Sequence, residues 1–164
     1  MNTPSRFSPA RRHGLQALAL LGLGAGWAPP AQAAGKTLPL SASLADELAR
    51  ALKARQPLVV MVSLHRCPWC EEVRNNYLAP MRAQERLPVV QVDMLSPRQT
   101  RDLQGAPTTH EALVRAWDVK VAPTVLFLGP QGKEVADRLV GGSPDFYSAY
   151  LDRRLALARE AVIT

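Results

Sequence analysis

Apolar residues are distributed along this chain in two patterns. One is typical of strands buried on both faces, and the other is typical of amphipathic helices. Continuous apolar runs of strand length predict three strands, over residues 58–62, 88–93 and 123–128. Apolar residues at helical spacing predict helices over residues 43–56, 68–86, 109–117 and 145–159. A glycine-containing turn at residues 129–132 leads into residues 134–140, which are predicted to form a hairpin with the third strand.

Residues with special backbone preferences set the ends of these helices. Ser43 and Thr109 are expected to cap the first and third helices, and residues 143–145 the last one. Pro80 is expected to kink or break the second helix. Residues 95–108 carry turn residues and charges, so they are predicted to be a loop with at most one helical turn.

The order of these elements predicts an α/β domain. Its central sheet would be mixed, with parallel strands, a terminal antiparallel hairpin and helices on both faces. The inward faces of the last two helices are expected to carry these residues: Leu113, Ala116 and Trp117 in one, and Phe146, Tyr150, Leu151 and Leu155 in the other.

The first 33 residues have the layout of a secretory signal peptide. Arginines without any acid precede a short apolar stretch from Leu15 to Trp27, and Ala31-Gln32-Ala33 fits a cleavage site. An uncleaved membrane anchor is the alternative, which the shortness of the apolar stretch disfavours. The Arg11-Arg12 pair raises the twin-arginine route, so the choice between that route and the general secretory (Sec) route stays open.

We therefore expect a signal peptide over residues 1–33, a lead-in segment over residues 34–42 and a folded domain over residues 43–164. Export would place the domain in the periplasm, where thiols oxidise readily. Three of the 20 basic residues and none of the 14 acidic ones lie in the leader, so its removal lowers the net charge from +6 to +3. The other basic residues are dispersed without interleaved aromatic residues, which argues against nucleic-acid binding.

Both cysteines of the chain lie in one motif, Cys67-Pro68-Trp69-Cys70, between a predicted strand and a predicted helix. The first turn of a helix has unpaired backbone N–H groups and a partial positive charge, which stabilise an anion. Cys67 should therefore favour its thiolate, with a pKa nearer ~7 than the ~8.5 of a free thiol. Cys70 lies one turn further in, so it should be less exposed and able to resolve a mixed disulfide.

A disulfide between these cysteines would close a very small loop, so a redox role explains the pair better than a stabilising bridge. Three alternatives stay open: a purely structural bridge, an inactive relic, and a metal site that adds His65. Structural zinc normally takes four ligands, which counts against the metal site. His65 and Arg66 precede Cys67, and either cation could lower the pKa of its thiol further.

A second motif, Val121-Ala122-Pro123-Thr124, opens the third predicted strand, where a proline is tolerated. Combined with the upstream Cys-x-x-Cys motif in this order of elements, it makes the chain resemble the thioredoxin superfamily from about Ser43 to Arg159. The residues before this motif (117–120), the turn at Gly129 to Val135 and Gly141-Gly142 resemble that family too. The leader and residues 64–70 are similar to exported thioredoxin-like reductases, including those of bacterial sulfur-oxidation and cytochrome-maturation systems.

The resemblance implies roles for individual residues. Cys67 would be the attacking thiolate, Cys70 the resolving thiol and Pro123 a cis-proline against the disulfide. The backbone of Ala122 would pair with an extended client segment, and Trp69 would contact the same client.

The chain also departs from the thioredoxin pattern. Thioredoxin has Gly-Pro between its cysteines and Trp before them, where this chain has Pro68-Trp69 and Arg66. The buried acid that accepts a proton in thioredoxin would fall near Met61, which cannot do so. Glu71 or Glu72 could take over, although both positions also suit solvated charges.

The expected function is that of an enzyme, a periplasmic thiol–disulfide oxidoreductase that reduces exported client proteins through a mixed disulfide. No nicotinamide or flavin motif is present, so we expect no cofactor, and reducing equivalents would come from a membrane electron-donor protein. The domain is expected to be a monomer that binds neither metal nor nucleic acid. A disulfide oxidase or isomerase, and a non-enzymatic redox-regulated binding or metal-carrier domain, are the alternatives.

Overall fold

The computed structural model describes residues 37–142 and 145–164. The predicted signal peptide, residues 34–36 of the lead-in segment and residues 143–144 of the predicted helix cap lie outside these ranges. In the part of the chain that is described, no helix is both long and apolar enough to cross a membrane.

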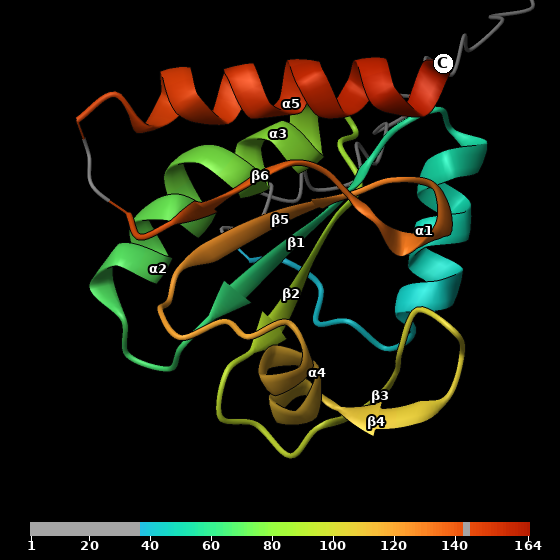
Figure 1. The fold of residues 1–164 in the computed structure, drawn as a ribbon. Coiled ribbons are helices and arrows are strands. Elements are labelled where there is room, and N and C mark those ends of the chain that lie inside the picture. Colours follow the sequence, from blue (N-terminus) through green and yellow to red (C-terminus); the bar gives the residue numbers. More distant parts are fainter. Residues whose placement is uncertain (1–36, 143–144) are drawn as a thin grey trace, which may run out of the picture. The chain divides into compact units, whose positions relative to one another are not determined.

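A four-stranded mixed sheet with the strand order β2-β1-β5-β6 lies at the centre of the domain (Figure 1). Its strands are β1 (Leu58–Ser63), β2 (Val89–Asp93), β5 (Thr124–Leu128) and β6 (Glu134–Val140). β1 and β2 run parallel, whereas β5 runs antiparallel to both β1 and β6. The predicted α/β class with a mixed sheet is confirmed, as is the terminal hairpin.

Helices cover both faces of the sheet, and one apolar cluster fills the space on each side. The first cluster lies under α2 (Pro68–Val73), α3 (Ala79–Gln84) and α5 (Tyr147–Ile163), and the second under α1 (Leu44–Lys53) and α4 (His110–Ala116). Within β1, Val59 and Met61 belong to the first cluster, while Val60 and Val62 belong to the second. This alternation follows from the period of two of a strand and explains why its whole apolar run is buried.

Two of the three predicted N-caps form the expected hydrogen bonds, whereas the N-cap residue of α5 is Phe146 rather than one of residues 143–145. The hydroxyl of Ser43 accepts one from the backbone N–H of Asp46 at 3.3 Å, at the start of α1. The hydroxyl of Thr109 accepts one from the backbone N–H of Ala112 at 3.2 Å, at the start of α4.

The predicted long second helix is divided by a π-helical stretch, η1 (Arg74–Leu78), between α2 and α3. Pro80 lies in the first turn of α3 and has no N–H to donate to the carbonyl group four residues earlier. Just before it, the N–H of Ala79 bonds to the carbonyl group of Arg74, five residues back. The irregularity expected at Pro80 is therefore present, and it lies on the N-terminal side of the proline.

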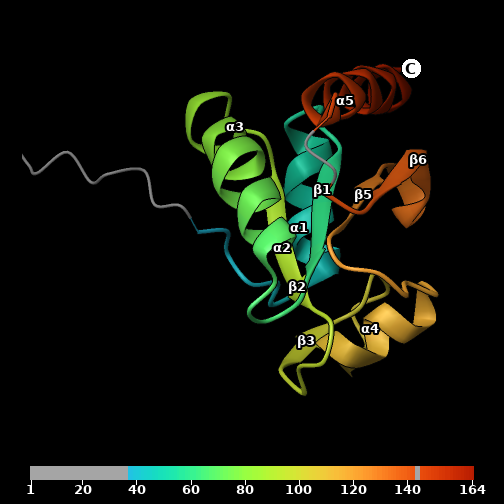
Figure 2. The ribbon, with the colours of Figure 1, turned by 90° about the vertical axis from the view of Figure 1, so that its left-hand side faces the viewer.

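The prediction of a loop over residues 95–108 was wrong. β3 (Gln99–Arg101) and β4 (Pro107–Thr109) form an antiparallel ribbon, which lies with α4 beyond the end of β2 (Figures 1 and 2). Leu103 at the tip of this ribbon packs against Gly132, where an added Cβ would come within 2.8 Å of the Leu103 side chain. Gly132 also has a φ of +72°, a backbone conformation that favours glycine.

The inward faces of two helices differ from the prediction. α4 buries His110, Leu113 and Val114, whereas Ala116 is exposed and Trp117 is half-buried. α5 buries Tyr147, Leu151, Leu155 and Ala158, whereas Phe146 and Tyr150 are exposed. Phe146 precedes α5 in a left-handed conformation, so the helix begins two residues later than expected and its apolar stripe one residue later.

The two outer strands of the sheet have different surroundings. Along β2, the lead-in segment adds a single parallel bridge in which the backbone of Gln91 bonds to Pro39 and Ser41. β6 is the other outer strand, and it carries Glu134, Asp137 and Arg138. Arg138 pairs with Glu134 and donates a hydrogen bond to the carbonyl oxygen of Trp117 at 2.9 Å.

Candidate active site

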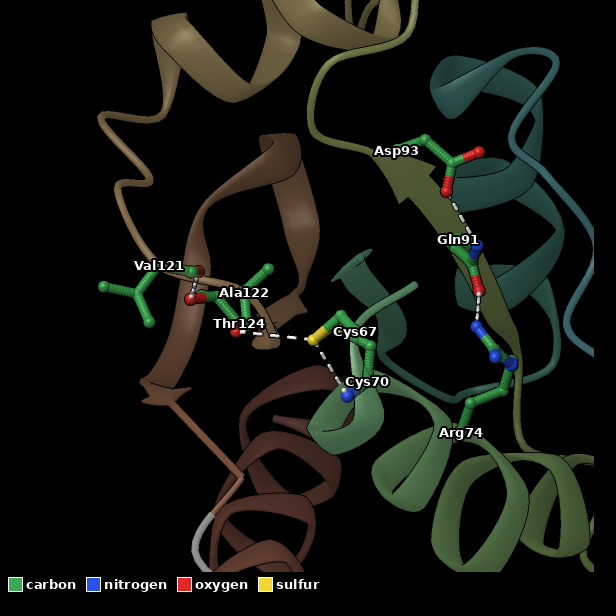
Figure 3. The surroundings of a disulfide bond; sticks show 8 residues. All are labelled: Cys67, Cys70, Arg74, Gln91, Asp93, Val121, Ala122 and Thr124. Carbon is green, nitrogen blue, oxygen red and sulfur yellow. Dashed lines mark hydrogen bonds between the residues drawn. A yellow bond between two sulfur atoms is a disulfide. The ribbon is translucent and has the colours of Figure 1, made fainter. Parts of the chain in front are cut away.

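The Cys-x-x-Cys motif lies where the chain leaves β1 and begins α2. Cys67 is the N-cap residue of α2 and is joined to Cys70 by a disulfide, with their Cα atoms 5.2 Å apart. Pro68 occupies the first helical position, which needs no N–H donor. The Sγ atom of Cys67 accepts a hydrogen bond from the backbone N–H of Cys70 at 3.2 Å (Figure 3). This N–H group is one of those that the start of a helix leaves without an intrahelical partner.

The two sulfur atoms have different surroundings. Cys67 is half-buried, while Cys70 is fully buried in the apolar cluster that contains Val59, Met61 and Val73. Trp69, between them, is 50% exposed. A partner molecule therefore reaches Cys67 and Trp69 first, and Cys70 is accessible only through Cys67.

The second sequence motif lies against the first. The Ala122–Pro123 peptide bond is cis, and the carbonyl oxygen of Ala122 lies 3.9 Å from Sγ of Cys67 (Figure 3). The Thr124 hydroxyl donates a hydrogen bond to the carbonyl oxygen of Val121 at 2.7 Å, which fixes the turn into β5. In the described part of the chain, the backbone of Ala122 takes part in no backbone hydrogen bond.

Gly142, which follows β6, lies close to both motifs. An added Cβ at Gly142 would lie 3.0 Å from Cβ of Trp69 and 3.3 Å from Cγ of Pro123. The absence of a side chain at Gly142 thus suits the close approach of these three segments. The predicted site residues Cys67, Cys70, Trp69, Ala122 and Pro123 thus lie together.

The predicted tuning residues His65 and Arg66 directly precede Cys67, and their effect on the pKa of its thiol stays a prediction. His65 and Arg66 are exposed, and within the described ranges neither forms a hydrogen bond with Cys67. Arg66 has a φ of +55°, a conformation that non-glycine residues adopt only at some cost. The structure thus provides Cys67 with a backbone donor rather than a side-chain cation.

The candidate proton acceptors Glu71 and Glu72 form no hydrogen bond with Cys70 among the described residues. Met61 is buried in the same cluster as Cys70 and has no group that could accept its proton. Glu71 is exposed, and Glu72 accepts a hydrogen bond from the side-chain amide of Asn76 at 2.7 Å. Among the hydrogen bonds of the described residues, none joins either acid to Cys70.

The sequence analysis missed a chain of polar side chains beside the motif. Nη1 of Arg74 donates to Oε1 of Gln91 at 3.3 Å, and Nε2 of Gln91 donates to Oδ1 of Asp93 at 2.7 Å (Figure 3). Gln91 is only 9% exposed. It faces the same side of the sheet as Met61, because the two are paired in register on the parallel strands. The signal for it was a polar residue inside an otherwise apolar strand.

Two further side chains with polar atoms, those of His110 and Tyr147, are buried in the domain. His110 is fully buried, with Nδ1 accepting from the backbone N–H of Asp93 at 3.0 Å and Nε2 donating to the carbonyl oxygen of Ser41 at 2.9 Å. Tyr147 lies in the same apolar cluster as Cys70, and its ring is 5.1 Å from that of Tyr77. Burial raises the pKa of Tyr147, and its hydroxyl has no hydrogen-bond partner among the described residues. In the same ranges, no three His, Cys, Asp or Glu side chains are grouped to hold a metal ion.

Comparison with known proteins agrees with this arrangement. The family model described as a thioredoxin-like domain matches residues 44–153. A solved structure of a DsbH oxidoreductase shares the fold with a TM-score of 0.52 and 18% identity, over 75% of this chain and 86% of that chain. A thioredoxin from Thermus thermophilus has a TM-score of 0.48 and 21% identity, over 77% of this chain and 89% of that one. No curated protein sequence matches the chain.

The family match spans the sheet, the helices on both faces and both site motifs. The similarity to solved structures shows the fold, and the close cysteine pair at a helix start shows the chemistry that this fold carries here. The chain therefore belongs to the family of thioredoxin-like domains and is a thiol–disulfide oxidoreductase.

Proposed function

We propose that this oxidoreductase is a periplasmic reductase of disulfides in exported client proteins, and that a membrane electron-donor protein restores its dithiol. The observation that carries the proposal is the asymmetry of the cysteine pair. Cys67 is accessible and accepts a hydrogen bond from a backbone N–H, whereas Cys70 is fully buried behind it.

In the reduced protein, the Cys67 thiolate attacks one sulfur of the client disulfide. A mixed disulfide forms at Cys67, and the other client sulfur leaves as a thiolate. Cys70 then loses its proton to solvent and attacks Sγ of Cys67, which releases the second client thiolate. The client gains two electrons, and the protein is left with the Cys67–Cys70 disulfide.

The client is held across the surface next to Cys67. Ala122 has unused backbone hydrogen-bonding groups beside the sulfur, so an extended client segment can pair with it as an added strand. The exposed ring of Trp69 provides apolar contact on the other side. Recognition through backbone groups and one aromatic ring accepts many sequences, which suits a reductase with several clients.

The direction of the reaction is inferred from which groups stabilise the Cys67 thiolate. A strong disulfide oxidant is one whose reduced form is specially stabilised. Here Cys67 has one backbone donor, and no side chain in the described ranges donates a hydrogen bond to it. The buried, apolar environment of Cys70 favours its neutral thiol. Weak stabilisation of the dithiol form favours a reductant over an oxidase.

Export is supported by the basic and apolar pattern of residues 1–33. A periplasmic reductase without its own nicotinamide or flavin site needs electrons from a partner that crosses the membrane. Expression of the full chain in a bacterium, followed by fractionation and N-terminal sequencing, tests this part of the proposal. A cytoplasmic protein that still begins at Met1 would contradict it.

Insulin reduction with dithiothreitol as the electron source tests the chemistry. Cys67→Ser should abolish activity, and Cys70→Ser should trap a mixed disulfide with the client. The midpoint potential against glutathione tests the direction, with a value nearer about −270 mV than about −120 mV expected for a reductase. A value at the oxidising end would favour the oxidase alternative, and equal activity of Cys67→Ser and wild type would remove the catalytic role.

A further inference from the structure

A cavity of about 660 Å³ opens at the carboxyl ends of β1 and β2. The two strands are parallel neighbours, but β1 leads into α2 on one face of the sheet and β2 leads, through the ribbon, into α4 on the other. Such a point, where two connections diverge, forms a crevice at which open α/β sheets bind ligands. The volume lies within the range of about 300–1,000 Å³ that small-molecule sites occupy.

The cavity is lined by charged groups of both signs that are not paired with each other. Arg66 and Arg74 contribute the positive charges, and Glu71 and Asp93 the negative ones. Within the described ranges, no salt bridge includes any of the four. Opposite charges that line one cavity without pairing can each take a ligand group of the opposite sign.

Gln91 keeps two of these charges apart. Its side-chain amide stands between Arg74 and Asp93 and hydrogen-bonds to both (Figure 3). Gln91 is buried on β2, so its amide is held in place between the guanidinium and the carboxylate. Nη2 of Arg74 and Oδ2 of Asp93 have no hydrogen-bond partner among the described residues.

From this arrangement we infer that the cavity binds a small zwitterion, a molecule of amino-acid to dipeptide size with one carboxylate and one ammonium group. Arg66 and Arg74 take the carboxylate, and Asp93 and Glu71 take the ammonium group. Cys67, Trp69 and Pro123 do not line the cavity, so this site is distinct from the proposed client surface. The inference does not depend on the redox function.

Titration of the oxidised protein with glycylglycine and with L-alanine, followed by two-dimensional NMR, tests the site. We expect shifts of the signals of residues 64–66, 74 and 91–97, with dissociation constants on the order of 1 mM. N-Acetylglycine lacks the amine and glycylglycinamide lacks the carboxylate, so each should bind about tenfold more weakly or worse.

Two variants separate the charges without disturbing the fold. Arg66→Gln changes an exposed side chain, and Asp93→Asn keeps an oxygen that can accept from Gln91. Each should weaken glycylglycine binding by about tenfold. The matched controls are Arg153→Gln and Asp152→Asn on the exposed face of α5, which should leave binding unchanged.

Any of three results would overturn the inference. The first is the absence of shifts with both zwitterions at about 20 mM, well above millimolar affinities. The second is that N-acetylglycine and glycylglycinamide bind as tightly as glycylglycine. The third is that both variants bind glycylglycine as tightly as the wild type while their melting temperatures match it. Insulin reduction measured on the same samples reports on the redox function separately.

Discussion

The backbone of Gly142 lies so close to Trp69 that an added Cβ would stand 3.0 Å from Cβ of the tryptophan. We therefore expect Gly142→Val to displace Trp69 and Pro123 and to lower kcat/KM for insulin reduction about tenfold, because small misplacements at a reacting site are costly. Gly142→Ala, with a smaller side chain, should have a smaller effect. Steady-state kinetics with both variants measures this.

Gly105→Ala is the control for this prediction. Gly105 has a φ of +83° and no atom within 4 Å of an added Cβ, so alanine there strains the backbone without crowding the site. We expect it to lower stability by about 1 kcal/mol and to leave kcat/KM unchanged. Full activity of Gly142→Val would show that Trp69 tolerates displacement.

The burial of Cys70 predicts strongly unequal thiol reactivity in the reduced protein. Iodoacetamide at neutral pH should modify Cys67 about threefold faster than a cysteine in an unstructured peptide, and should leave Cys70 unmodified in the folded state. Mass spectrometry of peptides after timed alkylation measures both rates. Equal modification of the two cysteines would contradict the asymmetry on which the proposed mechanism depends.

His110 joins three parts of the chain through its two ring nitrogens. His110→Leu should lower the free energy of unfolding by about 2–4 kcal/mol, because the buried N–H of Asp93 and carbonyl group of Ser41 would lose their partners. His65→Leu, at an exposed position, should change it by no more than about 0.5 kcal/mol. Urea denaturation of both variants measures the difference, and similar stabilities would show that water replaces the ring.

The buried hydroxyl of Tyr147 should make stability fall at high pH. Burial, with a smaller contribution from Tyr77, raises the pKa of Tyr147 above its ordinary value of 10.0. Above that pH the unfolded state loses the proton while the folded state keeps it. The free energy of unfolding therefore does not depend on this group below about pH 10. Above that pH it declines by about 1.4 kcal/mol per pH unit.

Tyr147→Phe should remove this part of the pH dependence and, at neutral pH, should raise stability by up to about 1 kcal/mol, because the hydroxyl has no partner to lose. Tyr150→Phe is the control, since Tyr150 is 56% exposed. Denaturation curves at several pH values measure the difference between variant and wild type. The same slope in wild type and Tyr147→Phe would contradict the prediction.

The central strands and the helix starts could be predicted because they depend on residues that are close together in the sequence. A fully apolar run such as residues 58–62 has few alternatives to a buried strand, and Ser43 and Thr109 cap helices through hydrogen bonds within one turn. The position of Cys67 at the start of α2 could be predicted for the same reason. The ribbon was missed because strands of three residues are too short to show a period.

The contacts that were missed depend on residues far apart in the sequence. His110 is buried only because the fold brings Ser41 and Asp93 to its ring. The side-chain oxygen of Gln91 has a hydrogen-bond donor because Arg74 projects from the adjacent helical segment. Among the described residues, no hydrogen bond joins the side chain of His65 or Arg66 to the sulfur of Cys67, and their effect on the pKa of its thiol stays a prediction.

The charges on β6 have a consequence for the protein at high concentration. An outer strand is a template onto which another chain can add, and such additions start aggregation. On this edge, an added strand would have to pack against the charged side chains of Glu134, Asp137 and Arg138. The domain therefore resists polymerising through its exposed edge while its backbone there stays uncovered.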